Sequence, residues 1–223
     1  MQLVFLDTDT YVFTSAERHL VAEVLGGAEA EIRGLLRGST KRLTVTGWPT
    51  DFVIPEVRSG DKTPTKDLIE VSVNPAHPGG VEPVFRTSFR ELLFHECHHA
   101  ARKHLLPDRE STLIDGAVME GLATAFERDG AGARPLWATY DPVDAAGWHT
   151  EMIATPHGRY DDWRYSQTDG CRWISYRVGT HIVDRALTNS GETAASLVAA
   201  STADVLRLAG LDRITQGEED PLL

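Results

Sequence analysis

Two histidines and a glutamate in one short segment, FHECHH at residues 94–99, are of the types that bind zinc and transfer protons. His95 and His99 are four residues apart, so in a helix, at about 100° per residue, both imidazoles project from one face. Both could reach a single tetrahedral ion at the usual Zn–N distance of about 2.0–2.1 Å. Glu96 flanks that face and could contact a metal-bound water. The segment has the H-E-x-x-H arrangement of zinc hydrolases, in which the carboxylate takes a proton from water and passes it to the leaving group.

A simpler interpretation stays open for this segment, because a helical histidine is usually a hydrogen-bonded core residue and a metal-free helical protein can carry the motif by coincidence. Two histidines at this spacing with a glutamate between them favour the metal site. His98 and Cys97 point away from the predicted zinc face. We expect His98 to support or pack beside the site and Cys97 to pack.

A catalytic zinc needs a third protein ligand and leaves its fourth position to water. The metzincin pattern is excluded, because Arg102 stands at its glycine position and Leu105 at its final histidine position. The thermolysin-like solution takes a glutamate from a following helix, and Glu120 lies in such a segment. We predict Glu120 as the third ligand.

Glu120 is the only charged residue between Asp115 and Glu127, in a segment of apolar and small residues. A carboxylate buried there is costly unless it is paired or bound to a metal. Pairing with Arg102 or Arg177 is the alternative. Asp115 and Glu127 are weaker ligand candidates, since both are nearer the helix ends and are expected to be solvated.

The motifs HECHH (95–99) and EGLA (120–123) together resemble the gluzincin pattern of H-E-x-x-H followed by E-G-x-A. The doubled histidine and the later YRVG (176–179) resemble the YjaZ-like family of predicted Zn-dependent proteases. The resemblance covers about residues 67–210. It implies a zincin-like fold with a small sheet over the active-site helix, and a zinc held by His95, His99 and Glu120. It implies no particular substrate.

A hydrolase of this type also needs a donor for the developing oxyanion. The resemblance favours Tyr176, because it places a helical tyrosine three residues before a glycine. A core tyrosine with its hydroxyl satisfied elsewhere is an equal alternative. The remaining candidates for the donor are Tyr160, Tyr165, His157 and His181.

The predicted fold class is α+β, mostly helical, with a small N-terminal mixed β-sheet over the active-site helix. Hydrophobic periodicity predicts strands at residues 3–6, 42–48, 52–57 and 67–73, with a loop at 58–66. It predicts helices at 15–37, 88–104, 110–128, 171–187 and 201–210, the second opened by a capping box at Ser88 and Glu91. The strand at 67–73 would be the edge strand above the metal, or else an ordinary internal strand. We expect a single domain over 1–223, with a less certain α/β part at 1–66, a catalytic core at 67–213 and a mobile tail at 214–223.

Composition narrows the classes of partner. The chain has 22 Lys plus Arg against 33 Asp plus Glu, a net charge of −11, with only four lysines, which argues against a nucleic-acid partner. We expect no membrane partner, because no signal peptide and no apolar stretch of about 18–20 residues is recognisable. The two distant cysteines are expected to be reduced thiols in a cytoplasmic protein.

The sequence therefore predicts a zinc metallopeptidase with one Zn²⁺ per chain and a peptide or protein as substrate. Glu96 would be the general base, with Tyr176 supporting the oxyanion. The alternative is a zinc-binding regulatory or inactive zincin-like protein without peptidase activity. The oligomeric state and the cleavage preference stay open.

Overall fold

The computed structural model describes residues 1–37, 42–106, 112–155, 163 and 171–212. It is an α+β structure, 58% helical with a small four-stranded mixed sheet, which confirms the predicted class and the predominance of helix. The chain divides into two compact units, Met1–Leu105 and Leu106–Leu223, here called the N-terminal and C-terminal units. None of the described helices is long and apolar enough to cross a membrane.

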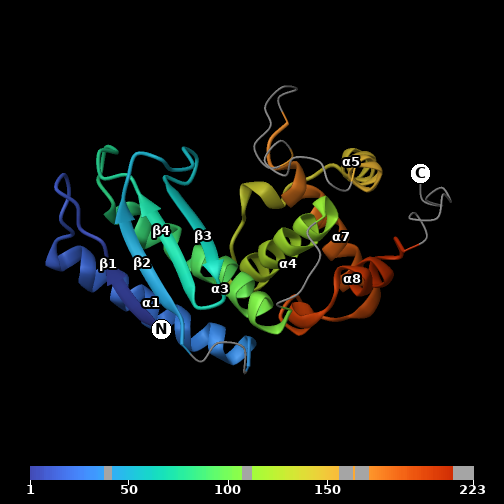
Figure 1. Ribbon diagram of the computed structural model, residues 1–223, viewed down its shortest axis with the longest axis horizontal. Coiled ribbons are helices and arrows are strands. Elements are labelled where there is room, and N and C mark those ends of the chain that lie inside the picture. The colour runs from blue at the N-terminus through green and yellow to red at the C-terminus, as the bar shows by residue number, and fades with distance from the viewer. Residues whose placement is uncertain (38–41, 107–111, 156–162, 164–170, 213–223) are drawn as a thin grey trace. The chain divides into compact units, whose positions relative to one another are not determined.

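The sheet lies in the N-terminal unit and has the strand order β1-β2-β4-β3 (Figure 1). Strand β2 pairs in parallel with β1 and β4, and β3 pairs antiparallel with β4. The strands are β1 (Gln2–Phe5), β2 (Thr44–Pro49), β3 (Ser59–Thr65) and β4 (Leu68–Val73).

The prediction of an edge strand at 67–73 is wrong, because β4 lies between β2 and β3. Its residues Ile69, Val71 and Val73 are buried, as in an internal strand. The edge strand next to β4 is β3, a segment for which the sequence predicts a loop, and β1 forms the other edge. The strand predicted at 52–57 is reduced to one isolated bridge between Ile54 and Ser59. Residues 59–65 therefore form a paired strand although their composition alone gives no strand signal.

An irregularity interrupts the pairing of β3 with β4. Lys62 is paired with Glu70 and Thr65 with Leu68, so two residues of β3, Thr63 and Pro64, lie opposite the single residue Ile69. An extra residue of this kind bends a strand and redirects its side chains. Pro64 has no N–H to offer to a ladder and is tolerated at a sheet edge.

In the described part of the N-terminal unit, the helices are α1 (Ser15–Leu35), α2 (Glu82–Thr87) and α3 (Phe89–Leu105). Figure 1 shows α1 and α3 on the same side of the sheet, and α3 packs against β3 and β4. A capping box of Thr14 and Glu17 opens α1.

The predicted box at Ser88 is wrong, because Ser88 has helical backbone angles. Its N–H donates to the carbonyl oxygen of Val84, and its Oγ lies 3.3 Å from Thr87 Oγ1. Ser88 therefore joins α2 directly to α3, so that α3 begins from the last turn of α2 and not from a capping box.

The C-terminal unit is helical, and α4 (Leu113–Ala131) and α7 (Ile174–Ser190) pack against each other at its centre (Figure 1). The surrounding elements are η1 (Leu136–Ala138), α5 (Pro142–Ala154), η2 (Ser196–Ala199) and α8 (Thr202–Ala209). The last of these begins and ends at the predicted residues, with Ser201 as its N-cap and Gly210 in the left-handed region after it.

The α4–α7 crossing depends on two glycines. A Cβ added to Gly179 would lie 1.8 Å from the carbonyl oxygen of Ala117, and one added to Gly121 would lie 2.2 Å from the backbone of Gly179. No side chain fits between backbones this close. Within the C-terminal unit, the contact that requires Gly121 is therefore the one with α7.

We predict that Gly179→Ala destabilises the protein, because the new methyl group must separate α4 from α7. The free energy of unfolding should fall by at least about 2 kcal/mol, as for overpacked cores. Gly147→Ala is the matched control, since Gly147 is a helical glycine of α5 with no atom near its Cβ position. That change should be neutral or stabilise by up to about 1 kcal/mol. Urea denaturation of the three proteins checks this, and equal stabilities would contradict it.

Candidate metal centre

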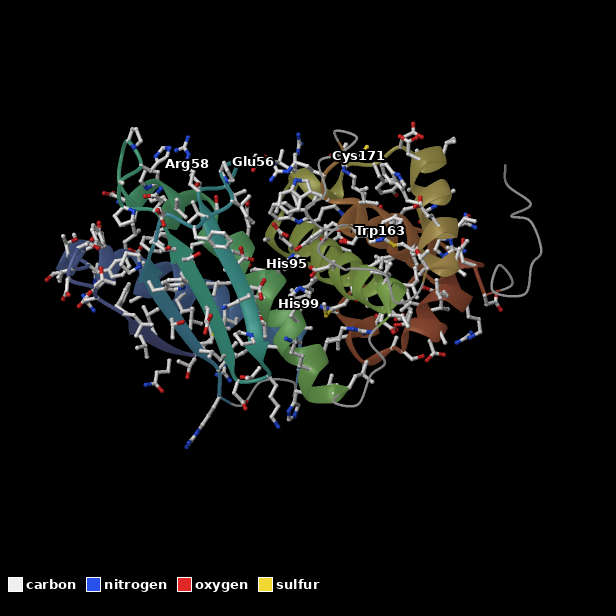
Figure 2. The ribbon with its side chains drawn as sticks, turned by 45° about the horizontal axis from the view of Figure 1, so that its top comes forward. Glu56, Arg58, His95, His99, Trp163 and Cys171 are labelled. Carbon is white, nitrogen blue, oxygen red and sulfur yellow. The ribbon has the colours of Figure 1, made fainter. Side chains whose placement is uncertain are left out.

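Helix α3 carries His95 and His99 and brings their Nε2 atoms to 3.1 Å from each other. The rings are nearly perpendicular, at 76°, with centroids 4.8 Å apart. Figure 2 shows the two labelled side chains next to each other on their helix. Two nitrogens bound tetrahedrally to one zinc at about 2.0–2.1 Å would be about 3.3–3.4 Å apart. The observed spacing therefore fits a shared ion almost without adjustment.

The two imidazoles are buried, with exposed fractions of 4% for His95 and 6% for His99. Every residue of α3 from Leu92 to Arg102 is buried, and Glu96 is only 3% exposed. Polar groups at such depth require partners. A cation between the two Nε2 atoms would satisfy both nitrogens together.

Glu96 is held by the edge strand. Thr63 of β3 donates from Oγ1 to Glu96 Oε2 at 2.5 Å and lies 3.1 Å from the Glu96 carbonyl oxygen. Burial, and then the neighbouring charge of Asp61 on the same strand, hold the pKa of the Glu96 carboxyl well above its ordinary value. The pKa is raised although the Thr63 hydroxyl acts in the opposite direction. A carboxyl group in this environment can hold a proton and release it, as a general acid–base group must.

Strand β3 is fastened to α3 at a second point, where Lys103 Nζ donates to the carbonyl oxygen of Thr63. The sequence does not predict Asp61 and Thr63 as residues of the site, because the composition of residues 58–66 favours a loop. The alternation of Asp61 and Thr63 with exposed Lys62 is the only local signal that could have found them.

Helix α4 carries Glu120, which is 1% exposed. Asp115 closes the capping box of α4 with Thr112, so its carboxylate is engaged at the helix start. The expectation that Glu127 is solvated is wrong, because its exposed fraction is 3%. Burial therefore does not distinguish Glu120 from Glu127 as a ligand, and the two differ in their position along α4.

Among the described residues, His95, His99 and Glu120 form a buried group that could hold a metal ion, with one ligand atom from each residue. Two imidazoles and a carboxylate are the donor set that catalytic zinc uses when its fourth position is left for water or substrate.

Tyr176 lies in the first turn of α7 and is 6% exposed. Its ring packs against Trp173 and Trp137, with centroid distances of 5.7 and 6.0 Å. Trp173 has a left-handed backbone (φ 65°), which is strained for a residue other than glycine. His181, the other candidate on α7, packs edge-on against Tyr140 at 5.2 Å. Tyr160, Tyr165 and His157 lie outside the described residues.

The two remaining residues of the motif are fully buried. Cys97 and His98 both have exposed fractions of 0%. Burial raises the pKa of the Cys97 thiol far above the physiological range, so the thiol stays protonated and makes a poor ligand. This agrees with the packing role expected for Cys97.

A helical histidine pair with an adjacent buried carboxylate, on an α+β scaffold with a buried glutamate on a later helix, defines a candidate mononuclear metal centre of the hydrolytic kind. Residues 79–207, more than half of the chain, match the family "Predicted Zn-dependent protease (DUF2268)". The chain belongs to this family, which confirms the resemblance noted in its sequence. The comparisons with curated proteins and with solved structures gave no match.

We predict about one zinc per chain in protein dialysed without chelator, and its loss in His99→Ala, because one imidazole cannot replace two. His104→Ala is the matched control, since His104 is an exposed histidine of the same helix. Its zinc content should equal that of the wild type. Elemental analysis by mass spectrometry measures both, and zinc-free wild-type protein after growth with added zinc would contradict the metal centre.

Proposed function

We propose that this protein is a zinc-dependent metallopeptidase of the gluzincin type, with a zincin-like fold. The observation that carries the proposal is the 3.1 Å separation of His95 Nε2 and His99 Nε2, beside a buried Glu96 that the edge strand holds in place. Membership of a family of predicted zinc-dependent proteases supports it.

In this proposal His95, His99 and Glu120 hold the ion. A bound zinc would polarise the scissile carbonyl and lower the pKa of the attacking water. Its positive charge would also oppose the effect of burial on the Glu96 carboxyl, favouring the ionised form that can accept a proton.

The chain's own residues then carry the proton. Glu96 accepts it from the attacking water as the water oxygen bonds to the carbonyl carbon of the peptide. Glu96 next donates this proton to the amide nitrogen as the carbon–nitrogen bond breaks, which leaves a carboxylic acid and an amine. Tyr176 is the proposed donor to the developing oxyanion, since a phenolic hydroxyl is a suitable partner for that oxygen.

The substrate proposed is an extended peptide that adds to the sheet edge. The edge strand is β3, and its residues Asp61 and Thr63 contact the proposed general base. Main-chain hydrogen bonds to a sheet edge bind peptides of many sequences, with the side-chain pockets adding preference. A strand that holds Glu96 and also receives the peptide would keep the scissile bond close to the base.

We predict that Glu96→Gln keeps its zinc and loses hydrolysis of a fluorescently labelled casein by roughly a hundredfold or more, the contribution expected of a general base. Glu91→Gln, a change of the same kind on the same helix, should leave activity unaltered. A metal-binding regulator or inactive relative would show no hydrolysis in the wild type and no difference between the three proteins. That result would exclude the peptidase.

The third ligand is tested by replacing each of the two buried carboxylates of α4 in turn with an amide. Glu120→Gln should weaken zinc binding at least tenfold in a competition titration with a chromophoric chelator, because a neutral amide is a poor zinc ligand. Glu127→Gln should bind zinc with the affinity of the wild type. The reverse pattern would assign the ligand to Glu127.

A further inference from the structure

We propose that Thr63 is the positioning residue of the general base, fixing the Glu96 carboxylate from the edge strand of the sheet. This inference rests on the proposed function, in which Glu96 moves the proton. It adds a residue outside the zinc-binding motif, on an element that carries none of the motif's residues.

The geometry assigns one carboxylate oxygen to Thr63. The hydroxyl of Thr63 donates to Glu96 Oε2, and the two side chains are 6% and 3% exposed, so water does not compete for this bond. The terminal torsion of a glutamate is otherwise broad. Because Thr63 binds Oε2, rotation of the carboxylate about its terminal torsion is restricted. Oε1 is the oxygen that Thr63 leaves for the proton transfer.

Thr63 is itself held from several directions, as a positioning residue must be. Lys103, seven residues after Glu96 on α3, donates to its carbonyl oxygen. The irregular pairing that places Thr63 and Pro64 opposite Ile69 lies at the same point of β3. Bulges of this kind often lie beside active sites, where they redirect a side chain.

A purely structural role is the competing explanation, since the hydroxyl also lies 3.1 Å from the Glu96 carbonyl oxygen and could simply fasten β3 to α3. The two roles differ in what they predict. A fastening role would lower stability and alter every property of the protein together, whereas a positioning role would lower kcat with little change in zinc content or KM.

The experiment compares Thr63→Val, which removes the hydroxyl at nearly constant shape, with Thr63→Ser, which keeps it. Thr65→Val is the matched control, since Thr65 is an exposed threonine of the same strand. All variants are made in the full chain and loaded with zinc. Thr63→Ala, which adds no bulk, replaces Thr63→Val if that variant does not fold by circular dichroism.

We expect Thr63→Val to lose roughly 10- to 100-fold in kcat on labelled casein, the effect of a lost hydrogen bond to a charged group. KM and zinc content should stay within about twofold of the wild type, and Thr63→Ser should recover most of the rate. In the Glu96→Gln background the same change should cost nothing further, because the two residues act as one unit. Wild-type kcat in Thr63→Val, or an equal loss in Thr65→Val, would overturn the inference.

A second readout separates this inference from the peptidase activity. Acetohydroxamate binding to the Co²⁺-loaded protein, followed by visible absorption, requires an acceptor beside the ion for the hydroxamate's proton. Thr63→Val and Glu96→Gln should each weaken this binding about tenfold, and Thr63→Ser and Thr65→Val should not. If the wild type binds hydroxamate without hydrolysing peptide, the peptidase fails and this comparison still decides the role of Thr63. If no variant of the fully folded protein binds Co²⁺, both proposals fall.

Discussion

The approach of two imidazole nitrogens to 3.1 Å on one helix is the constraint around which the N-terminal unit is organised. When both nitrogens carry lone pairs they repel each other, so either one holds a proton and donates it to the other or both face a cation. Burial makes this choice more important, because bulk water has little access to His95 and His99. A bound zinc would accept the lone pairs of both nitrogens at once.

The same helix places an acid–base group beside the pair, and the sheet controls that group. Without the sheet, the buried Glu96 carboxyl would keep its proton, because desolvation disfavours the carboxylate. Thr63 favours the ionised form by donating to it, and Asp61 opposes ionisation through its charge. The irregular edge strand thus acts on the protonation state and on the orientation of Glu96. A peptide seated on that strand would meet both effects at once.

The sequence predicts the histidine helix better than it predicts the strand that packs beside it. The four-residue spacing of His95 and His99 is a local property, so a helix converts it directly into a shared face. Residues 59–65 have no apolar alternation, and their strand forms because β4 offers a free partner and α3 offers Glu96 and Lys103. Tertiary contacts of this kind override strand propensity.

The sequence also predicts the ends of helices less well than the helices themselves. Thr112 rather than Glu110 opens α4, since a capping box with Asp115 satisfies the free N–H groups of the first turn. Helix α5 is not among the predicted helices. It begins after Asp141, its N-cap, with Pro142 at the first helical position, and the sequence contains this signal. The burial of Glu127 could not be read from the sequence, because a position near a helix end does not determine what packs over it.

The motifs that reveal the family also describe packing. Gly121 directly follows Glu120, Gly179 lies three residues after Tyr176, and the two glycines meet where α4 crosses α7. Because no side chain fits at that crossing, neither helix can slide along the other without a clash or a void. The crossing therefore sets the register of Glu120 relative to Tyr176 within the C-terminal unit. Glycines that a motif search treats as spacers of a zinc signature determine how the proposed ligand and the proposed oxyanion donor are held with respect to each other.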